Sequence, residues 1–552
     1  MTCLKFSVHT RALIIMTLLF ASTTYCMYGQ EPIYSYYYRV YLRDKGDNST
    51  GKYSTLDLLS LKAVNRRLKS GIKVPDFRDF PVNKSYVNKI TLLGLKLHTT
   101  SKWMNTALFK SQSAFDINSL LNLPFVSNVK IVKTPSKKNG LSNKLNFQVT
   151  QTDFPPYDQP LTMINGLRIH DSGYDGKNIL IAILDGGFLN SDVISSLSDL
   201  RSRKGIRKTY DFVKNTGSVY NASTHGTAVL SVLAGKITGQ IEGSAPGADY
   251  LLLKTEDVES EYPCEEDFWA AGAEFADSTG ADIISSSLGY FNFDDPSLNY
   301  KYSDLDGNTA FVTKVADIAA SKGILVVNSA GNERDKVWKS ILFPSDGDSV
   351  IAVGAVDGFG MISDFSSSGP AADKRIKPDN VAMGVNVTVQ ASENLIGRSS
   401  GTSFSCPVLS GIAACIIQAV PLALNSDIIN VLHSSGDRYS SPDSLYGYGI
   451  PDIVHALDEL QKKYILVPED GIIMYPNPTT GQFEITFSAP PEKVTIEIIS
   501  LTGKLLFEEK YADFAGRSIV ITDLKNSRQG IYLVRITDPS GVHVRRIVKL
   551  KN

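Results

Sequence analysis

Residues 400–407 read Ser400-Gly401-Thr402-Ser403-Phe404-Ser405-Cys406-Pro407, a turn of small residues that runs directly into an apolar segment, residues 408–420. Thr402 or Ser403 is predicted to be the N-cap of a helix, and Pro407 falls near the first turn, where a missing N–H costs little. The turn thereby places a hydroxyl at the positive end of a helix, which favours a developing oxyanion. Most Gly-Thr-Ser triplets are loops or caps, so the rest of the chain has to decide whether Ser403 is a nucleophile.

The composition is that of a globular protein with several domains. The chain has 552 residues, of which 43% are hydrophobic and 20% charged, and its formal net charge is −1. At about 150 residues per domain, this length predicts two to four domains. The near-zero charge gives no indication of a nucleic-acid partner or a charged membrane surface, so binding has to depend on a local site.

The N-terminus, residues 1–30, has the features of a secretory signal peptide. Lys5 and Arg11 precede an apolar run at residues 12–21, which is too short to span a bilayer. We expect cleavage after this run and before residue 31. Cys26 raises the question of a lipoprotein, but the residues before it make a poor lipobox. No later segment is long and apolar enough to be predicted as a transmembrane helix.

The five cysteines form neither a disulfide framework nor a zinc site. Removal of the signal peptide takes away Cys3 and Cys26, which leaves Cys264, Cys406 and Cys415. The last two lie on one predicted apolar helix and are expected to fill the core. A bridge that involves Cys264 stays open as an alternative, and no Cys/His cluster has the spacing of a zinc site.

Residues 31–140 are predicted to form a small α+β domain without a catalytic cluster. Strand patterns occur at residues 37–42, 89–97, 103–110 and 126–133, and helical patterns at residues 54–69 and 116–121. Residues 135–144 are rich in Ser, Lys, Asn and Gly, and we interpret them as an exposed linker.

Continuous apolar runs alternate with helical stretches in residues 150–464. The runs cover residues 179–184, 283–284, 324–327 and 350–353. Strands buried on both faces have this composition, and their alternation with helices predicts a parallel sheet with flanking helices. The site of such a sheet lies at the carboxyl ends of its strands.

The C-terminal region, residues 468–552, has a different pattern. Short alternating segments are separated by Gly, Pro and Asn turns, at residues 483–487, 494–499, 504–507, 518–521, 531–536 and 544–548. This pattern predicts a small β-sandwich.

Polar residues at the ends of the apolar runs supply the parts of a nucleophilic catalyst. Asp185 follows the first run, His225 opens an apolar helix, and Asn332 comes soon after the third run. Taken alone, Asp185 is explained as a turn aspartate, His225 as a capping histidine and Asn332 as part of an Asx turn. Together with Ser403 they form a complete set, because the serine needs an imidazole, the imidazole a carboxylate and the oxyanion an amide donor. The order Asp, His, Ser is one of three known for this triad, and no Gly-x-Ser-x-Gly elbow followed by Asp and His is present.

This arrangement resembles the subtilisin-like serine peptidases (subtilases, peptidase family S8). The resemblance covers about residues 175–455 and rests on motifs in family order: Ile183-Leu184-Asp185-Gly186-Gly187, His225-Gly226-Thr227-Ala228-Val229, Gly243-Ser244-Ala245-Pro246-Gly247, Ser287-Leu288-Gly289, Ser329-Ala330-Gly331-Asn332, Lys377-Pro378-Asp379 and Gly401-Thr402-Ser403. It implies a three-layer α/β fold in which Asp185 orients His225, His225 is the general base and then acid, and Ser403 is the nucleophile.

The resemblance also implies the rest of the site. Asn332 and the backbone N–H of Ser403 form the oxyanion hole. The substrate backbone pairs with one segment that also walls the P1 pocket, Ser287-Leu288-Gly289, and the opposite wall consists of Ala330 and Gly331. No metal and no cofactor are implied for catalysis.

Some positions depart from the family pattern. The family usually has Ser or Thr after the catalytic Asp, where this chain has Gly186, so one hydrogen bond to the carboxylate has to come from backbone or water. The helix after the nucleophile usually reads Met-Ala-Thr-Pro-His, and here it reads Phe404-Ser405-Cys406-Pro407-Val408. Residues 290–308 carry four aspartates with the chemistry to bind structural calcium, but without EF-hand spacing we favour a solvated acidic loop; they are Asp294, Asp295, Asp304 and Asp306.

The flanking regions fit the same resemblance. Residues 31–140 stand where subtilases carry an inhibitory propeptide, and a purely structural domain is the alternative. Residues 468–552 contain Met474-Tyr475-Pro476-Asn477-Pro478-Thr479 and end in a basic strand. They resemble the type A sorting domain of the type IX (Por) secretion system of the Bacteroidetes, and an Ig-like adhesive module is the alternative. The implied partner is the type IX machinery.

We therefore expect a secreted or cell-surface serine endopeptidase, made as a zymogen, that cleaves proteins or peptides through an acyl-enzyme. Its expected route is Sec export to the periplasm and type IX translocation across the outer membrane. Self-processing is expected to remove an N-terminal fragment near residues 135–150. The alternative is a non-catalytic binding or adhesive protein on a subtilase scaffold, which a gap in the triad would have favoured.

Overall fold

The computed structural model describes residues 36–48, 52–135, 144–145, 147–151, 156–464, 471–475, 477, 479–487, 489–512, 514, 516 and 518–549. The predicted signal peptide and most of the predicted linker lie outside these residues. The chain divides into two compact units, Met1–Leu460 and Gln461–Asn552. The first unit therefore contains both the N-terminal α+β region and the predicted peptidase region.

A seven-stranded parallel sheet forms the centre of the first unit, with the order β13-β12-β11-β10-β5-β9-β6. The strands are β5 (Leu180–Asp185), β6 (Ile206–Asp211), β9 (Asp249–Lys254), β10 (Ile283–Ser286), β11 (Leu325–Ser329), β12 (Val350–Val356) and β13 (Asn380–Met383). The apolar runs of the sequence are central strands of this sheet, which confirms the predicted fold class. The strand order reverses between β5 and β10, so the carboxyl ends of β5, β10 and β11 meet at the place where such sheets bind ligands.

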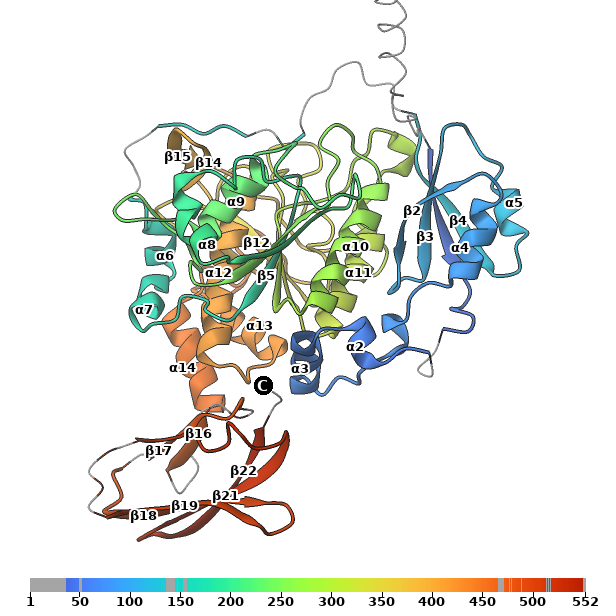
Figure 1. Ribbon diagram of the computed structural model, residues 1–552. Helices are drawn as coiled ribbons and strands as arrows, with labels where there is room; N and C mark the ends of the chain where they lie inside the picture. Colours follow the sequence, from blue (N-terminus) through green and yellow to red (C-terminus); the bar gives the residue numbers. More distant parts are fainter. Residues whose placement is uncertain are drawn as a thin grey trace, which may run out of the picture. The chain divides into compact units, whose positions relative to one another are not determined.

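Helices cover the sheet in two layers (Figure 1). The pair α9 (His225–Ala234) and α12 (Thr402–Ala419) forms one layer, and the pair α10 (Cys264–Thr279) and α11 (Phe311–Ser321) forms the other. The smaller elements are α6 (Gln159–Met163), α7 (Gly166–Asp171), α8 (Ser198–Ser202), α13 (Asn425–Ser434), α14 (Ile453–Tyr464), the hairpin β7 (Lys236–Ile237) with β8 (Ile241–Glu242), and the hairpin β14 (Val387–Ser392) with β15 (Leu395–Ser399).

Helix α12 begins one residue earlier than a Thr402 cap would allow and two residues earlier than a Ser403 cap would allow. Gly401 is the N-cap, and Thr402 and Ser403 are the first two helical residues, so the predicted cap was wrong. Pro407 consequently lies inside the helix rather than near its first turn, and its missing N–H leaves the Ser403 carbonyl without a helical donor. The hydroxyl of Ser287 donates to that carbonyl at 3.0 Å and so replaces the lost bond.

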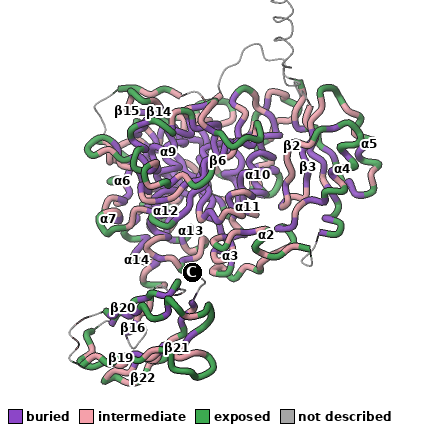
Figure 2. The backbone as a smooth tube through the Cα atoms, viewed as in Figure 1, coloured by how far each residue is buried: buried purple, intermediate pink, exposed green. Residues whose placement is uncertain are grey.

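The full extent of α12 also corrects the expectation about membrane spans. Its 18 residues have a mean hydropathy of 1.5, so the described part of the chain does contain a helix long and apolar enough to cross a membrane. Of that helix, 89% is buried inside the structure, and Figure 2 shows it within the buried interior. Packing against α9 and the sheet accounts for its composition.

Residues 36–135 form an α+β domain around an antiparallel sheet of order β2-β3-β1-β4. Its strands are β1 (Tyr36–Leu42), β2 (Lys96–Ser101), β3 (Thr106–Ser111) and β4 (Val126–Lys133), and its helices are α2 (Thr55–Leu58), α3 (Leu61–Lys69), α4 (Lys84–Thr91) and α5 (Asn118–Leu121). One face packs on α10 and α11 (Figure 1), and Trp103, Leu108 and Val132 share their buried core cluster.

Two predictions for this domain were wrong. The helix predicted at residues 54–69 is interrupted, because Leu59 is extended and Ser60 starts a new helix by accepting the Ala63 N–H at 3.2 Å. The strand predicted at residues 89–97 begins as helix α4, whose buried residues Val87 and Ile90 have helical spacing.

The second unit, described by itself, is a two-sheet antiparallel β-sandwich, as predicted. One sheet has the order β16-β17-β20 and the other β19-β18-β21-β22. The strands are β16 (Ile472–Tyr475), β17 (Phe483–Phe487), β18 (Lys493–Ser500), β19 (Leu505–Ala512), β20 (Ser518–Ile521), β21 (Gly530–Asp538) and β22 (Gly541–Lys549). Alternate residues of these strands form one buried core, which includes Phe483, Ile496 and Val534.

Candidate active site

The carboxylate of Asp185 and the imidazole of His225 form a closely bonded pair. Asp185 ends β5 and is fully buried, and His225 is the first residue of α9 and is 5% exposed. The Nδ1 atom of His225 lies 3.0 and 2.9 Å from the two carboxylate oxygens. Because an ionised carboxylate only accepts hydrogen bonds, Nδ1 carries the proton and Nε2 is left as an acceptor.

Two glycines make this pairing feasible. A Cβ on Gly226 would lie 2.5 Å from the carbonyl oxygen of Gly187 and 3.0 Å from the Cβ of Asp185, so only glycine lets α9 approach β5 this closely. The backbone N–H of Gly186 donates to Asp185 Oδ1 at 2.7 Å. The bond that a Ser or Thr hydroxyl would supply therefore comes from the backbone, which is one of the two sources expected from the sequence.

Ser403 and Asn332 meet at the start of α12. Ser403 is 9% exposed, and its backbone N–H belongs to the first helical turn, where such groups have no acceptor within the helix. Asn332 follows β11, and its Oδ1 accepts from the N–H and the hydroxyl of Thr402 at 2.9 and 3.0 Å. These two donors identify the oxygen end of the amide, so its NH2 group is the end directed away from Thr402.

Two cavities meet at these residues. His225, Asn332 and Ser403 line a cavity of about 420 Å³. A second cavity of about 410 Å³ shares Asn332 and Ser403 and continues along Ser287, Leu288, Gly289 and Gly331. The structure thus brings together the predicted groups of the catalyst and most of the predicted pocket walls.

Ala330 lies behind the wall of the P1 pocket to which the family resemblance assigned it. It is fully buried, its N–H donates to the Val353 carbonyl at 2.9 Å, and its own carbonyl accepts from Leu342 at 3.0 Å. Its neighbours Ser329 and Gly331 line the cavity instead.

Lys144, Leu145, Phe147, Gln148 and Thr150 also line the site, which the sequence did not predict. The ring of Phe147 lies 5.6 Å from that of His225 and 5.8 Å from that of Phe404. Thr150 and Arg398 pair as in an antiparallel sheet, with N···O distances of 2.9 and 2.7 Å. The Ser399 hydroxyl donates to the Gln148 carbonyl at 2.8 Å. The only signal in the sequence is the apolar alternation of Leu145, Phe147 and Val149 after the Lys-rich stretch.

The aspartates of residues 290–308 hold turns together. Asp295 Oδ1 accepts from the Ser297 N–H at 3.1 Å, and Asp306 Oδ1 accepts from the N–H groups of Asn308 and Thr309 at 2.8 and 2.7 Å. Within the described residues, the acidic group that could hold an ion lies elsewhere, at Glu256, Glu261 and Glu265.

The three cysteines that the structure describes take no part in the site. Cys264, Cys406 and Cys415 are free and buried, so Cys264 forms no bridge with the other two. Burial raises the pKa of the Cys264 thiol well above its ordinary value and that of Cys406 to about 11. The thiols are therefore protonated and unreactive, as suits core residues.

Comparisons with known proteins agree with this geometry. The Subtilase family (Peptidase S8) matches residues 176–449, the Peptidase S8 propeptide domain of Bacteroidota matches residues 37–164, and the Secretion system C-terminal sorting domain matches residues 473–550. Subtilisin E of Bacillus subtilis is 30% identical over 296 residues, which are 53% of this chain and 69% of that protein. For Subtilisin of Bacillus pumilus the identity is again 30% over 296 residues, which cover 96% of that protein.

The crystal structure of fervidolysin from Fervidobacterium pennivorans, described as a keratinolytic enzyme related to subtilisin, has a similar fold. It is 17% identical, with a TM-score of 0.54, over 95% of this chain and 77% of that one. Fold, site and comparisons together define a subtilisin-like serine endopeptidase with a propeptide. The chain belongs to the subtilase family. Its C-terminal sorting domain indicates secretion to the cell surface or the extracellular space.

Proposed function

We propose that this chain is a secreted serine endopeptidase, made as a zymogen, that hydrolyses peptide bonds through an acyl-enzyme on Ser403. The observation that carries the proposal is the buried Asp185–His225 pair, which opens on the same cavity as Ser403 and Asn332. We assign residues 1–30 to the signal peptide, 31–140 to the propeptide domain, 150–464 to the peptidase domain and 468–552 to the sorting domain.

Acylation uses the tautomer that Asp185 imposes. His225 Nε2 takes the proton of the Ser403 hydroxyl as its oxygen attacks the substrate carbonyl, and the Asp185 carboxylate stabilises the imidazolium that forms. The negative charge on the carbonyl oxygen is met by the Asn332 NH2 group and the Ser403 N–H. His225 then gives its proton to the leaving amine, and the acyl group stays on Ser403.

Deacylation repeats these steps with water as the nucleophile. His225 takes a proton from water, whose oxygen attacks the ester carbon, and returns the proton to Ser403. Serine, imidazole, carboxylate, amide and water complete the cycle, so we propose that catalysis needs no cofactor. Protein or peptide substrates would lie against Ser287–Gly289 on one side and Gly331 on the other.

The decisive test is a comparison of Ser403→Ala with a matched serine on the same helix. Ser405 is buried and donates to the Thr402 carbonyl at 3.1 Å, so Ser405→Ala tests the loss of a nearby hydroxyl. We expect wild type and Ser405→Ala to label with a fluorophosphonate and to cleave unfolded casein, and Ser403→Ala to do neither. Labelling that survives in Ser403→Ala would refute the proposal. Cell-surface binding that is unchanged in this variant, without any proteolysis by wild type, would establish the adhesive alternative.

The secretion route has a separate test. We propose that Sec exports the chain to the periplasm and that type IX machinery then carries it across the outer membrane through residues 468–552. Removal of these residues is expected to leave the protein in the periplasm. Its appearance in the medium at the wild-type level would contradict the route.

A further inference from the structure

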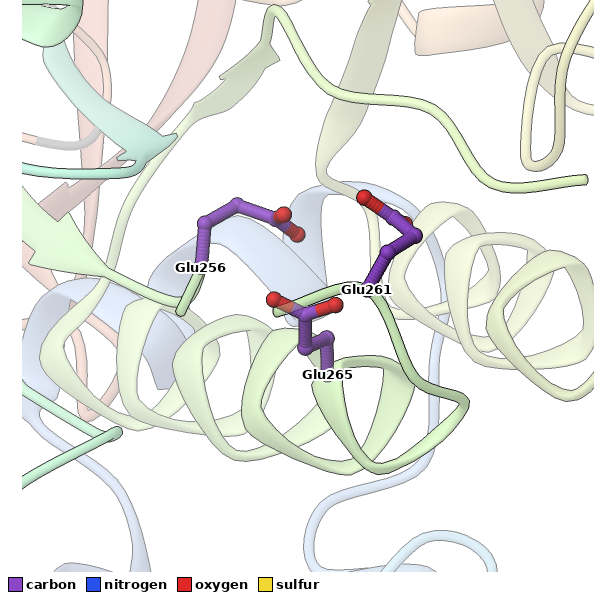
Figure 3. A group of neighbouring side chains, drawn as sticks. All are labelled: Glu256, Glu261 and Glu265. Carbon is purple, nitrogen blue, oxygen red and sulfur yellow. The ribbon is translucent and has the colours of Figure 1, made fainter. Parts of the chain in front are cut away.

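Three glutamates surround the ammonium group of Lys144. Figure 3 shows Glu256, Glu261 and Glu265 with their carboxylates turned toward one another, and one oxygen of each lies within 4.8 Å of the others. Glu256 follows β9, Glu261 lies in the next loop, and Glu265 is in the first turn of α10. Lys144 Nζ lies 2.7 Å from an oxygen of each.

The cluster is built rather than a chance gathering of surface acids. The side chains of Glu256 and Glu265 are 3% and 0% exposed, and that of Glu261 is 22% exposed. Glu256 accepts from the Tyr290 hydroxyl, and Glu265 accepts from the N–H groups of Asp257 and Tyr262 at 2.8 and 3.0 Å. Two carboxylates are therefore fixed in place, while Glu261 adds a third from the more exposed side.

A cation beside these carboxylates favours their ionised form. Burial, together with the neighbouring carboxylates, raises the pKa of Glu265 well above its ordinary value, and burial raises that of Glu261 to about 7. Each ionised carboxylate makes it harder for its neighbours to ionise, and the positive charge of Lys144 makes it easier. Lys144 lies within the stretch where self-processing is expected, near residues 135–150, so a cut after it would leave three carboxylates without this partner.

The cluster lies beside the reacting groups. Lys144 and Leu145 line both cavities that meet at Ser403. The Lys144 N–H donates to the Val258 carbonyl at 3.1 Å, as a substrate strand would. A Cβ on Gly186 would lie 2.4 Å from Leu145 and 2.9 Å from Val258, so the departure from Ser or Thr at Gly186 makes room for Leu145.

The chain continues past Ser403 on the other side. Phe147 packs against His225 and Phe404, and Gln148 and Thr150 bond to Ser399 and Arg398, just before the turn that carries the nucleophile. The described residues before and after position 146 thus line one cavity together with Ser403.

We propose that Glu256, Glu261 and Glu265 form a subsite for a basic side chain on the amino-terminal side of the cleaved bond, which Lys144 occupies in the uncleaved chain. The substrate class is therefore peptides with Lys or Arg directly before a Leu-like residue and shortly before the cleaved bond. This inference rests on the proposed function.

Self-processing follows from the same placement. The cleaved bond is one of the two between Leu145 and Phe147. Its carbonyl carbon is transferred from nitrogen to Ser403 Oγ, the Ser403 proton passes through His225 to the leaving amine, and water then releases the new carboxylate. The amine becomes the N-terminus of the mature enzyme, at residue 146 or 147.

An ammonium suits this cluster better than calcium. Lys donates three hydrogen bonds, one for each carboxylate, and the Ser260 carbonyl lies at 3.0 Å from Nζ as a further acceptor. Calcium instead takes six to eight oxygens at about 2.3–2.6 Å.

The test compares two peptides on the mature enzyme. One has the sequence of residues 142–150, Ser-Asn-Lys-Leu-Asn-Phe-Gln-Val-Thr, and the other has Met in place of Lys. We expect kcat/KM to be about tenfold higher for the Lys peptide, since a buried charge pair is lost with Met. Glu261→Gln should bring this ratio close to one. Glu259→Gln, an exposed glutamate of the same loop, should leave it unchanged.

A second readout uses the full chain. Lys144→Met should slow the appearance of the mature N-terminus about tenfold, and Lys144→Arg should restore it. Equal kcat/KM for the two peptides, a ratio that Glu261→Gln does not change, or a first cut outside residues 145–147 would each overturn the subsite. Activity that depends on calcium with no preference for Lys would overturn it in favour of a metal site. Failure of both peptides and of fluorophosphonate labelling would instead refute the proposed function itself.

Discussion

Two of the contacts that the described N-terminal region makes with the peptidase domain differ in chemistry. On α10 the contact includes charged groups removed from water, whereas along the active site it consists of a half-exposed segment, residues 144–145 and 147–150. A contact of buried charges holds one fixed arrangement, because every charge has to keep its partner. A segment held by backbone bonds and partly exposed side chains can be exchanged for another peptide of similar sequence.

Three arginines of the N-terminal domain take part in the contact on α10. Arg39 Nε donates to both oxygens of Asp267 at 3.0 and 2.8 Å, and Arg66 and Arg67 both bond to Asp277. The side chains of all five residues are at most 3% exposed. The active-site contact is less buried, since the side chains of Lys144 and Glu261 are 18% and 22% exposed. We infer that the first contact persists in the zymogen while the second yields to catalysis.

The largest expected effect is on stability and results from removing the Asp277 carboxylate. Asp277→Asn removes the carboxylate of two buried arginines, and Arg67 alone has a second one, in Asp79. Leaving a buried charge without its partner costs about 3–5 kcal/mol in free energy of unfolding. Chemical denaturation should be measured in the Ser403→Ala background, which keeps the chain uncleaved. Asp47→Asn, at an exposed pair with Lys52, is the control and should leave the unfolding midpoint unchanged.

The second effect is a pH dependence confined to the same contact. His98 lies on β2, its Nε2 is 2.9 Å from the Phe212 carbonyl oxygen, and burial lowers its pKa from 6.5 to about 4. The unfolded chain binds a proton near pH 6.5 that the folded chain does not, so this contribution to stability is complete above pH 6.5 and is lost as the pH falls through about 4. Burial also raises the pKa of Asp267 to about 6, although the neighbouring Arg39 lowers it. The contribution of Asp267 to stability therefore has the opposite pH dependence from that of His98, because it is lost as the pH rises through about 6.

The variant His98→Gln separates the pH effect of His98 from that of Asp267. The difference in unfolding free energy between wild type and His98→Gln should change by about 2 kcal/mol between pH 7.5 and 5, to the disadvantage of wild type at pH 5. The measurement again uses the Ser403→Ala background. His455→Gln, at a histidine whose side chain is 54% exposed, is the control. A constant difference across this range would show that His98 is not buried in the zymogen.

The sequence predicted the chemistry of the site better than its specificity. The apolar runs identified the central strands, and Asp185, His225 and Asn332 each follow or open an element, which placed them at one edge of the sheet. The glutamate cluster has no such signal, because Glu256, Glu261 and Glu265 come from a strand end, a loop and a helix. Buried arginines such as Arg66 were equally invisible, since charged residues at a helix end are usually exposed.

The floor of the P1 pocket shows the same limit. Leu342 comes from a loop without regular pattern, yet it fills the space between the two predicted walls. A Cβ on Gly289 would lie 2.6 Å from its Cβ, and a Cβ on Gly331 would lie 2.6 Å from its Cγ. Leu342 lines the same cavity as Ser287 and Gly331, and we propose that it limits the space for a large side chain before the cleaved bond.

The third effect concerns Leu342 and tests whether other peptides can replace the segment that lies in the active site. Leu342→Ala should raise kcat/KM about tenfold for peptides with Phe before the cleaved bond, relative to peptides with Asn there, because the pocket gains room for apolar contact. Leu342→Ile, which keeps the volume, should retain the wild-type preference. An unchanged ratio in Leu342→Ala would mean that the pocket floor lies elsewhere.

The smallest expected effect is at Phe147, after the cleaved bond. Its ring meets His225 nearly edge-on, at an interplanar angle of 83°, and loss of this contact in Phe147→Ala should slow self-processing a few-fold, or by about 1 kcal/mol. Mass spectrometry of the secreted chain over time measures the rate, and the exposed Gln148→Ala is the control. In the Ser403→Ala background, Phe147→Ala should hardly change the unfolding midpoint. A loss of stability as large as that of Asp277→Asn would break the distinction between the two contacts, because the strand would then hold the zymogen together as firmly as the buried arginines do.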